Sequence, residues 1–413
     1  MQRSGFIMLL VSAFIISCSQ GRQSGDLSNH KISQNDWSSG NGKEDKIAKP
    51  GAEQTNLYFD KIKDKSVGIV ANQTSLIGQT HLVDSLLSAG INVVKVFSPE
   101  HGFRGQAEAG EHVNNNKDTK TGLPLISLYG DHRKPTPVDL EGIDIVIFDL
   151  QDVGARFYTY ISTLTLVMEA CAENGIPLLV LDRPNPNGFY IDGPLLEPEF
   201  SSFVGMHPIP VVHGLTMAEY ARMVNDELWL KNNVQCKLDW IKVEGYNHKT
   251  LYRLPVRPSP NLPDMESVYL YPSLCLFEGT IVSVGRGTDF PFSIIGYPEY
   301  KDGNYSFTPE SRAGASLNPP QKGNLCNGFN LRNEVPDFIN KPGIRLKWLI
   351  MMYNASPDKD KFFNSFFNKL AGTAMLKQQI ESGLSEDAIR ATWKPGLEKF
   401  QAIRQKYLLY QDF

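Results

Sequence analysis

In the first half of the chain, apolar segments alternate with amphipathic helical patterns, and this alternation constrains the fold most. Nearly continuous apolar runs at 65–71, 91–97, 143–149 and 176–181 are expected to be strands. Helices are expected at about 81–88 and 160–173, closed by Gly90 and Gly175. Strands that are apolar on both faces are typical of a parallel sheet covered by helices on both sides. The sequence therefore predicts an α/β fold with a Rossmann-like parallel sheet.

Each expected strand is followed at once by residues that are costly to bury. These residues are Asn72, Gln73 and Thr74; Glu100 and His101; Asp149, Gln151, Asp152 and Arg156; and Asp182, Arg183 and Asn185. In a parallel sheet all four carboxyl ends lie at one edge, so we expect these residues to converge on one polar cleft. The alternative is that each group only caps its own turn. Four such groups together favour a ligand site.

The cleft lacks the signatures of nucleotide, metal and serine-hydrolase sites. Asn-Gln-Thr-Ser follows the first strand, where a dinucleotide site has G-x-G-x-x-G and a P-loop has G-x-x-x-x-G-K-S/T. The chain contains no G-x-S-x-G, C-x-x-C or H-E-x-x-H pattern, so we predict no cofactor and no metal. A net charge of −4 with mixed acids and bases argues against nucleic acid. Carboxylates, amides, arginines and aromatic residues remain, and these groups bind sugars.

A second region begins near residue 193. Thr216 and Glu219 form a T-x-x-E capping box that opens a helix, and 234–244 alternates like a strand. Three proline-containing or polar stretches at 257–263, 271–273 and 277–280 read as loops, which would present Asn261, Glu278 and Arg286 rigidly. Helical patterns run from about 342 nearly to the end of the chain.

The first 55 residues look like a targeting signal followed by a tether. Residues 1–18 combine a basic start with an apolar run too short to span a bilayer, which indicates a signal peptide. The segment Ile15-Ile16-Ser17-Cys18 resembles a bacterial lipobox and implies acylation of Cys18. The alternative is an ordinary signal peptide with an incidental cysteine. Residues 19–55 are too polar to bury a core, so we expect a disordered tether.

The other four cysteines are Cys171, Cys236, Cys275 and Cys326. An even number in an oxidising compartment permits disulfides. Cys171 and Cys275, however, lie in apolar segments where free thiols behave as small hydrophobic groups. Buried thiols are the favoured interpretation.

Several long stretches are similar to one known family. Residues 67–74, 97–105, 149–162, 181–188, 197–210, 258–262 and 277–289 resemble the NamZ-type exo-β-N-acetylmuramidases, long catalogued as a domain of unknown function. The resemblance covers about residues 56–413. It implies release of single β-N-acetylmuramic acid residues from the non-reducing end of peptidoglycan fragments. It also implies a Rossmann-like domain, here expected at 56–192, joined to a smaller α/β domain at 193–413, with the active site in the cleft between them.

This chemistry assigns provisional catalytic roles. Glycoside cleavage needs an acid for the leaving oxygen and usually a second carboxylate. We expect Glu100 to be the acid, because His101, aromatic neighbours and partial burial favour its protonated form. A structural turn carboxylate is the alternative for Glu100. Asp152 is the first candidate for its partner and Glu278 the second, and two further alternatives are Glu108 and Glu111.

The substrate suggests the binding roles. Muramic acid carries a lactyl carboxylate that a guanidinium can grip with two hydrogen bonds. The candidates for this grip are Arg156, Arg183 and Arg286, and those for the N-acetyl group and hydroxyls are Asn72, Gln151 and Asn185. His101 and Asn261 are further candidates for substrate binding. Two other readings stay open, a sugar-binding lipoprotein without turnover and a murein-associated scaffold. Release of free sugar from a β-muramide would separate the enzyme from both.

The lipobox generates the first prediction. Cys18→Ala should release the protein from the membrane fraction, because the acylated thiol is the expected anchor and the tether behind it is polar. With the anchor intact, Ser19 after the cysteine suggests a periplasm-facing place in the outer membrane. Fractionation followed by immunoblotting measures the effect, with Ser19→Ala as the control that keeps the thiol. Unchanged fractionation of Cys18→Ala would rule out lipid anchoring at this residue.

Overall fold

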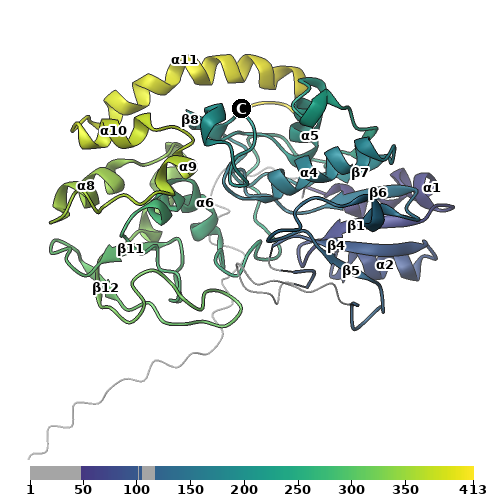
Figure 1. Ribbon diagram of the computed structural model, residues 1–413, viewed down its shortest axis with the longest axis horizontal. Coiled ribbons are helices and arrows are strands. Elements are labelled where there is room, and N and C mark those ends of the chain that lie inside the picture. The colour runs from purple at the N-terminus through teal and green to yellow at the C-terminus, as the bar shows by residue number, and fades with distance from the viewer. Residues whose placement is uncertain (1–47, 101, 105–116) are drawn as a thin grey trace, which may run out of the picture. The chain divides into compact units, whose positions relative to one another are not determined.

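The computed structural model describes residues 48–100, 102–104 and 117–413. Its main sheet has six parallel strands in the order β10-β7-β6-β1-β4-β5 (Figure 1). The strands are β1 (Val67–Ala71), β4 (Val93–Ser98), β5 (Leu125–Ser127), β6 (Ile145–Asp149), β7 (Leu178–Leu181) and β10 (Leu238–Ile241). Counted along the chain, these strands follow the Rossmann order 3-2-1-4-5-6. The predicted fold class is confirmed.

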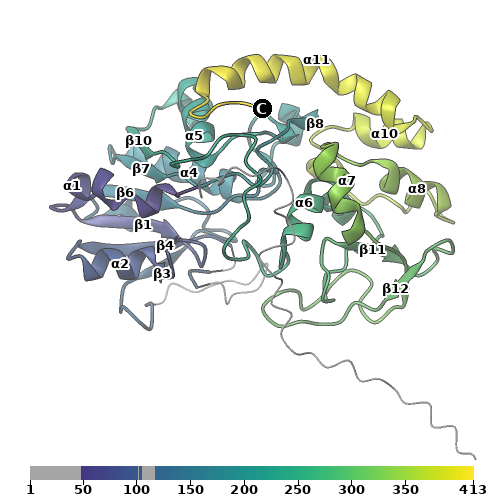
Figure 2. The same ribbon diagram turned by 180° about the vertical axis from the view of Figure 1, so that it is seen from behind.

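Helices cover both faces of this sheet, as the apolar strands predicted. Alternate residues of one strand enter different cores: Ile147 of β6 packs on one face and Phe148 on the other. The core that contains Ile147 includes residues of α1 (Phe59–Ile62) and α2 (Leu82–Ser88). The core that contains Phe148 includes residues of α4 (Tyr160–Glu173) and α5 (Met217–Asp226), and these elements can be followed in Figure 2. The sheet is therefore buried on both faces.

Most of the predicted elements form close to their expected bounds. Helix α4 spans the expected residues, and α5 opens with the predicted capping box, in which Thr216 and Glu219 exchange hydrogen bonds. The short strand β5 was not predicted. Strand β10 comes from beyond residue 193, where the second domain was expected to begin, and it completes the first sheet. The Rossmann-like sheet thus draws on residues up to 241.

The C-terminal region adds a small antiparallel sheet and several helices. This sheet has the order β11-β13-β12, with strands Ile294–Tyr297, Cys326–Asn330 and Tyr305–Phe307. The helices are α6 (Met265–Leu274), α7 (Val335–Asn340), α8 (Lys347–Ala355), α9 (Phe367–Ala371), α10 (Met375–Glu381) and α11 (Glu386–Arg404). Helix α11 packs on β8 (Asp192–Leu195), which pairs with β9 (Pro210–Val212). The remaining short elements are β2 (Leu76–Ile77), β3 (Thr80–His81) and α3 (Pro137–Leu140).

One expected loop is helical. Residues 271–273 lie inside α6 although they contain Pro272. Proline has no N–H, so the carbonyl of Val268, four residues earlier, loses its partner within the helix. The side-chain amide of Asn187 donates to that carbonyl at 3.1 Å. A distant side chain thus replaces the missing helical hydrogen bond. The next stretch, Cys275–Gly279, is a short 3₁₀ helix rather than an open loop.

The described residues test part of the expectations for the cysteines and the N-terminus. Cys171, Cys236, Cys275 and Cys326 are free and buried, as favoured. No helix in the described ranges is long and apolar enough to cross a membrane. Cys18, the signal peptide and most of the tether lie outside those ranges, so their roles stay predictions. The expected tether was too long at its C-terminal end, because Gly51–Glu53 forms a 3₁₀ helix and Ala52 is buried in the core.

Arg156 was expected to bind substrate, but the structure places it in the interior. Its guanidinium is fully buried and donates four hydrogen bonds of 2.8–3.0 Å to backbone carbonyls. The acceptors are Pro194 in β8, Ile209 just before β9, and Leu370 and Ala371 in α9. Burial lowers the pKa of Arg156 to about 9. This side chain joins three segments and has no access to a ligand.

Replacing Arg156 should therefore cost stability. In Arg156→Met the four carbonyls lose their donors, and we expect the free energy of unfolding to fall by about 3 to 5 kcal/mol. Chemical denaturation followed by circular dichroism measures the change. Arg253→Met, at an exposed position, is the matched control and should stay within about 0.5 kcal/mol of the parent. A loss below about 1 kcal/mol for Arg156→Met would show that the clamp is dispensable.

Candidate active site

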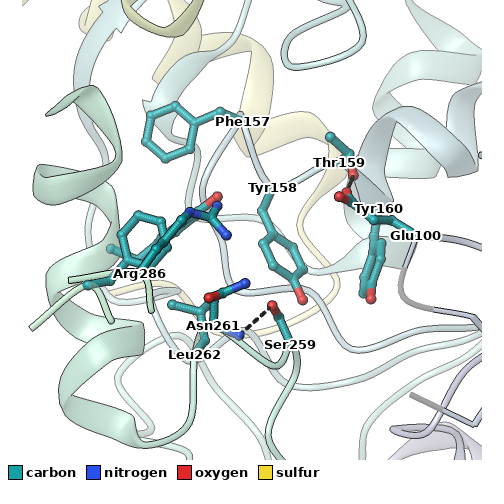
Figure 3. A pocket seen from close by; sticks show the side chains of 11 residues that line it. Glu100, Phe157, Tyr158, Thr159, Tyr160, Ser259, Asn261, Leu262 and Arg286 are labelled. Atoms are coloured by element: carbon teal, nitrogen blue, oxygen red, sulfur yellow. Dashed lines mark hydrogen bonds between the residues drawn. The ribbon is translucent and has the colours of Figure 1, made fainter. Parts of the chain in front are cut away.

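A cavity of about 60 Å³ lies beyond the carboxyl end of the main sheet. Both halves of the chain line it (Figure 3). The lining residues are Glu100, which follows β4; Phe157, Tyr158, Thr159 and Tyr160 at the start of α4; Ser259, Asn261 and Leu262; Tyr271 of α6; and Arg286 and Phe292. Of the four strand ends expected to converge, those of β4 and β6 are followed by segments that reach this cavity, and loops of the second region complete its wall.

Glu100 is the single carboxylate among the described lining residues. It is half-buried, and Thr159 Oγ1 donates a hydrogen bond of 3.3 Å to its Oε2. Thr159 occupies the N-cap of α4, but its hydroxyl makes no capping bond there. The hydroxyl is therefore used to hold the carboxylate. Burial is the main cause, and the charge of Glu100 the second, that raises the pKa of the nearby Tyr129 to about 12. Tyr129 therefore stays protonated beside Glu100.

Aromatic rings form much of the wall. Tyr158 packs edge-on against Tyr160 and Tyr271, with ring centroids 4.8 and 5.9 Å apart, and Tyr271 packs on Phe292 at 4.9 Å. The hydroxyl of Tyr158 donates to the carbonyl of Pro258 at 2.9 Å. Burial raises the pKa of Tyr158 and of Tyr160, so both remain neutral. Such a wall offers apolar faces to a sugar ring and keeps the tyrosines uncharged.

Arg286 faces Glu100 across the view in Figure 3. Its Nε donates to Glu278 Oε1 at 2.6 Å, and its guanidinium lies over the Phe292 ring, 4.9 Å from the centroid. Burial alone would lower the pKa of Arg286, but the Glu278 carboxylate raises it above its usual value. No hydrogen bond to the two Nη atoms is found among the described residues. Arg286 is thus held at one end and can bind an anion with the other.

Two other predicted residues stand beside this arginine. Asn261 lines the cavity, and its amide donates to the carbonyl of Ala315 at 2.9 Å. Glu278 does not line the cavity. Its carboxylate receives Arg286 on one oxygen and the Cys275 thiol on the other, at 3.5 Å. The structure therefore gives Glu278 the role of holding Arg286.

Asn72 and Arg183, both predicted as binding residues, lie behind the cavity wall. Arg183 is buried and makes a bidentate ion pair with Asp149 at 2.6 and 2.9 Å. The amide of Asn72 donates to the hydroxyl of Tyr160 at 2.8 Å. Arg183 is engaged by Asp149 and does not line the cavity, and Asn72 acts on the cavity through the tyrosine that it holds.

Gln151, Asn185 and Asp152 are also buried and do not line the cavity. Both side-chain hydrogen bonds from Gln151 go to backbone carbonyls, and the amide of Asn185 donates to the carbonyl of Leu215. Asp152 accepts from the backbone N–H of Gly154 at 2.6 Å, and His213 Nε2 lies 3.7 Å from the same oxygen. Asp152 is sequestered in the interior, so we do not keep it as the catalytic partner.

The structure thus brings together Glu100, Asn261 and Arg286 of the predicted set. His101, Glu108 and Glu111 lie outside the described residues. The prediction missed the aromatic and hydroxyl groups of the wall: Phe157, Tyr158, Thr159, Tyr160, Tyr271 and Phe292. The run Phe-Tyr-Thr-Tyr at 157–160, directly after the third strand's polar end, was the available signal.

Comparisons with known proteins agree with this architecture. Models of the N-terminal and C-terminal domains of the exo-β-N-acetylmuramidase NamZ match residues 67–266 and 269–410. The peptidoglycan β-N-acetylmuramidase NamZ of Bacillus subtilis (strain 168) is 40% identical over an alignment of 374 residues, and the match covers 86% of this chain and 89% of that protein.

Two solved structures of DUF1343 family proteins from Bacteroides fragilis NCTC 9343 share the fold. Their TM-scores are 0.83 and 0.74, at 48% and 28% identity. The matches cover 89% and 88% of this chain and 99% of each solved chain. With both family models matched along most of its length, this chain belongs to the exo-β-N-acetylmuramidase NamZ family.

Proposed function

We propose that this protein is a glycosidase that releases terminal β-N-acetylmuramic acid from the non-reducing end of peptidoglycan fragments, in cell-wall turnover or recycling. The observation that carries the proposal is the cavity itself. Between aromatic walls it presents one carboxylate, Glu100, and one guanidinium, Arg286, whose Nε alone is bonded to Glu278. Membership of the NamZ family supports the sugar and the bond that is cleaved.

Glu100 is the proton donor in this proposal. General acid catalysis requires a carboxyl group that reaches the leaving oxygen while bulk water is kept away. Glu100 lines the cavity, is half-buried and is oriented by Thr159. The neighbouring Tyr160 remains protonated, and its hydroxyl, which accepts from Asn72, can donate a hydrogen bond to a sugar hydroxyl.

Arg286 is the ligand for the lactyl carboxylate. Glu278 fixes its Nε, which leaves the two Nη atoms directed at the cavity. A guanidinium bound in this way is pre-oriented, so it loses little side-chain entropy when a carboxylate arrives. Glucosamine derivatives have no lactyl group, and the same arginine would then gain nothing from the substrate.

The cellular location of the reaction is suggested by the signal peptide and lipobox expected at the N-terminus. We propose that acylated Cys18 anchors the protein to the membrane with its catalytic part facing the periplasm, where murein fragments occur. The support is the lipobox-like segment 15–18 and the polar stretch behind it.

The first catalytic prediction concerns Glu100. Glu100→Gln keeps the size of the side chain and removes the transferable proton, so folding should survive while turnover falls about 10²- to 10⁴-fold. The loss should be larger on a murein disaccharide than on a nitrophenyl β-muramide, because nitrophenolate leaves without a proton. Release of free N-acetylmuramic acid, followed by chromatography, measures both rates.

A thermal melt that matches the parent is the control for folding of Glu100→Gln. If such a variant still cleaves the disaccharide within a few-fold of the parent rate, Glu100 is a structural carboxylate. Stable sugar binding without release by the parent protein would instead favour the binding lipoprotein.

The second catalytic prediction concerns specificity. The parent should cleave a nitrophenyl β-N-acetylmuramide far better than the matching β-N-acetylglucosaminide. Arg286→Ala should reduce this preference by about 10- to 100-fold, which corresponds to the roughly 1.5 to 3 kcal/mol of a hydrogen bond to a charged group. Ratios of kcat/KM for the two substrates measure the effect. Arg253→Ala, which removes an exposed arginine that lies outside this cavity, is the control. Equal rates of the parent on both sugars would contradict the proposed contact between Arg286 and the lactyl carboxylate.

A further inference from the structure

A second and larger cavity adjoins the first. Its volume is about 610 Å³, against about 60 Å³ for the first. Asn261 lines both cavities. The other residues around the second cavity are Arg257, Pro260, Pro263, Gly287, Thr288, Asp289, Pro291, Arg312, Ala313, Gly314 and Ala315. None of these other residues lines the first cavity.

Two turns form the wall that the cavities share. In the turn 257–263, Ser259 and Leu262 line the first cavity, whereas Pro260 and Pro263 line the second. In the turn 286–292, the end residues line the first cavity, and residues 287–289 and 291 line the second. Each turn thus contributes residues to both cavities. A chain molecule that starts in the first cavity reaches the second by passing Asn261.

The wall of the second cavity is built in advance of any ligand. Gly287 has φ +81°, and a Cβ there would come within 2.3 Å of the carbonyl of Glu310. Asn261 holds Ala315 through its amide, and Arg312 and Ser316 exchange two backbone hydrogen bonds of 2.8 and 2.9 Å. These contacts fix the segment 312–315 against the turn at Asn261. The cavity therefore does not need the ligand to order its wall.

Its charge selects an anion. Arg312 pairs with Asp289 at 2.7 Å, and both side chains are exposed. Arg257 is exposed too, and across the described residues its guanidinium has no ion pair or hydrogen bond. The cavity thus carries two guanidinium groups and one carboxylate, a net positive charge that attracts a carboxylate.

We propose that this second cavity binds the leaving part of the glycan and that Arg257 recognises a carboxylate on it. The inference rests on the proposed function, which places the terminal muramic acid in the first cavity. Peptidoglycan alternates two amino sugars, so the leaving saccharide begins with N-acetylglucosamine and continues with a second muramic acid. That residue carries the next carboxylate, either on its bare lactyl group or at the end of an attached peptide.

The test compares a short and a long substrate. The short one is the disaccharide of muramic acid and N-acetylglucosamine, and the long one is a bare tetrasaccharide with muramic acid at its non-reducing end. A nitrophenyl β-N-acetylmuramide, which has no leaving saccharide, is the reference substrate. The parent should have a kcat/KM about three- to tenfold higher for the tetrasaccharide than for the disaccharide of the same linkage, because one partly exposed charge pair is gained. Arg257→Ala should remove this length preference through a higher KM, and Arg257→Lys should retain most of it.

Two controls isolate the charge. Arg253→Ala removes an exposed arginine that lines neither cavity, so it should change no rate. A tetrasaccharide whose inner lactyl carboxylate is amidated should lose the preference in the parent and should respond no further to Arg257→Ala. A peptide-bearing tetrasaccharide tells the two sources apart, since it should exceed the bare one only if the peptide carboxylate is the ligand.

Opposite results are readily told apart. An Arg257→Ala variant that keeps the length preference, or that loses equally on the nitrophenyl glycoside, overturns the inference, because the cavity would then hold nothing or hold the terminal sugar. A parent that fails to cleave the nitrophenyl β-muramide and both oligosaccharides contradicts the proposed function itself. Cleavage of all substrates without any length preference overturns only the role of the second cavity.

Discussion

The buried ion pair between Asp149 and Arg183 fixes the edge of the sheet on which the site is built. Asp149 ends β6, and Arg183 follows β7 and also donates to the carbonyl of Leu76 in β2, the short strand that follows β1. The pair thus ties the neighbouring strands β6 and β7 to the segment after β1, at the point where the strand order reverses. Removing one partner would leave an unpaired charge in the interior, which is strongly unfavourable. The Asp149–Arg183 ion pair therefore helps to position the loops beyond this edge.

The site lies one layer farther out than the strand ends. Because the sheet is buried on both faces, polar groups at its edge must find partners within the protein. Asn72, Gln151 and Asn185 do so, and their bonds hold the loops rather than a ligand. The groups that reach the cavity come next along the same loops, as with Tyr160, which Asn72 supports. The polar residues at the sheet edge thus support the loops that carry the lining residues of the cavity.

This layering explains what the sequence could and could not predict. Apolar runs and capping signals located β1, β4, β6, β7, α4 and α5, because burial on both faces leaves a strong pattern. Strand ends and motifs located Glu100, Asn261 and Arg286. The same reasoning selected Arg156 and Arg183, because a sequence shows where a strand ends but not which side chain turns inward. The loop prediction at Pro272 was wrong for a related reason: the carbonyl of Val268, which the proline leaves without a helical partner, accepts from Asn187, 81 positions away.

Arg156 shows how a residue can serve the site without touching a ligand. It directly precedes Phe157, the first of the aromatic run that lines the cavity. Its four hydrogen bonds join that run to β8 and to α9, more than 200 residues later. The hydrophobic core that contains Phe157 is also continuous from the sheet into the C-terminal helices. The placement of Glu100 from one half of the chain opposite Arg286 from the other is therefore set by shared packing, and the buried guanidinium holds the wall between them.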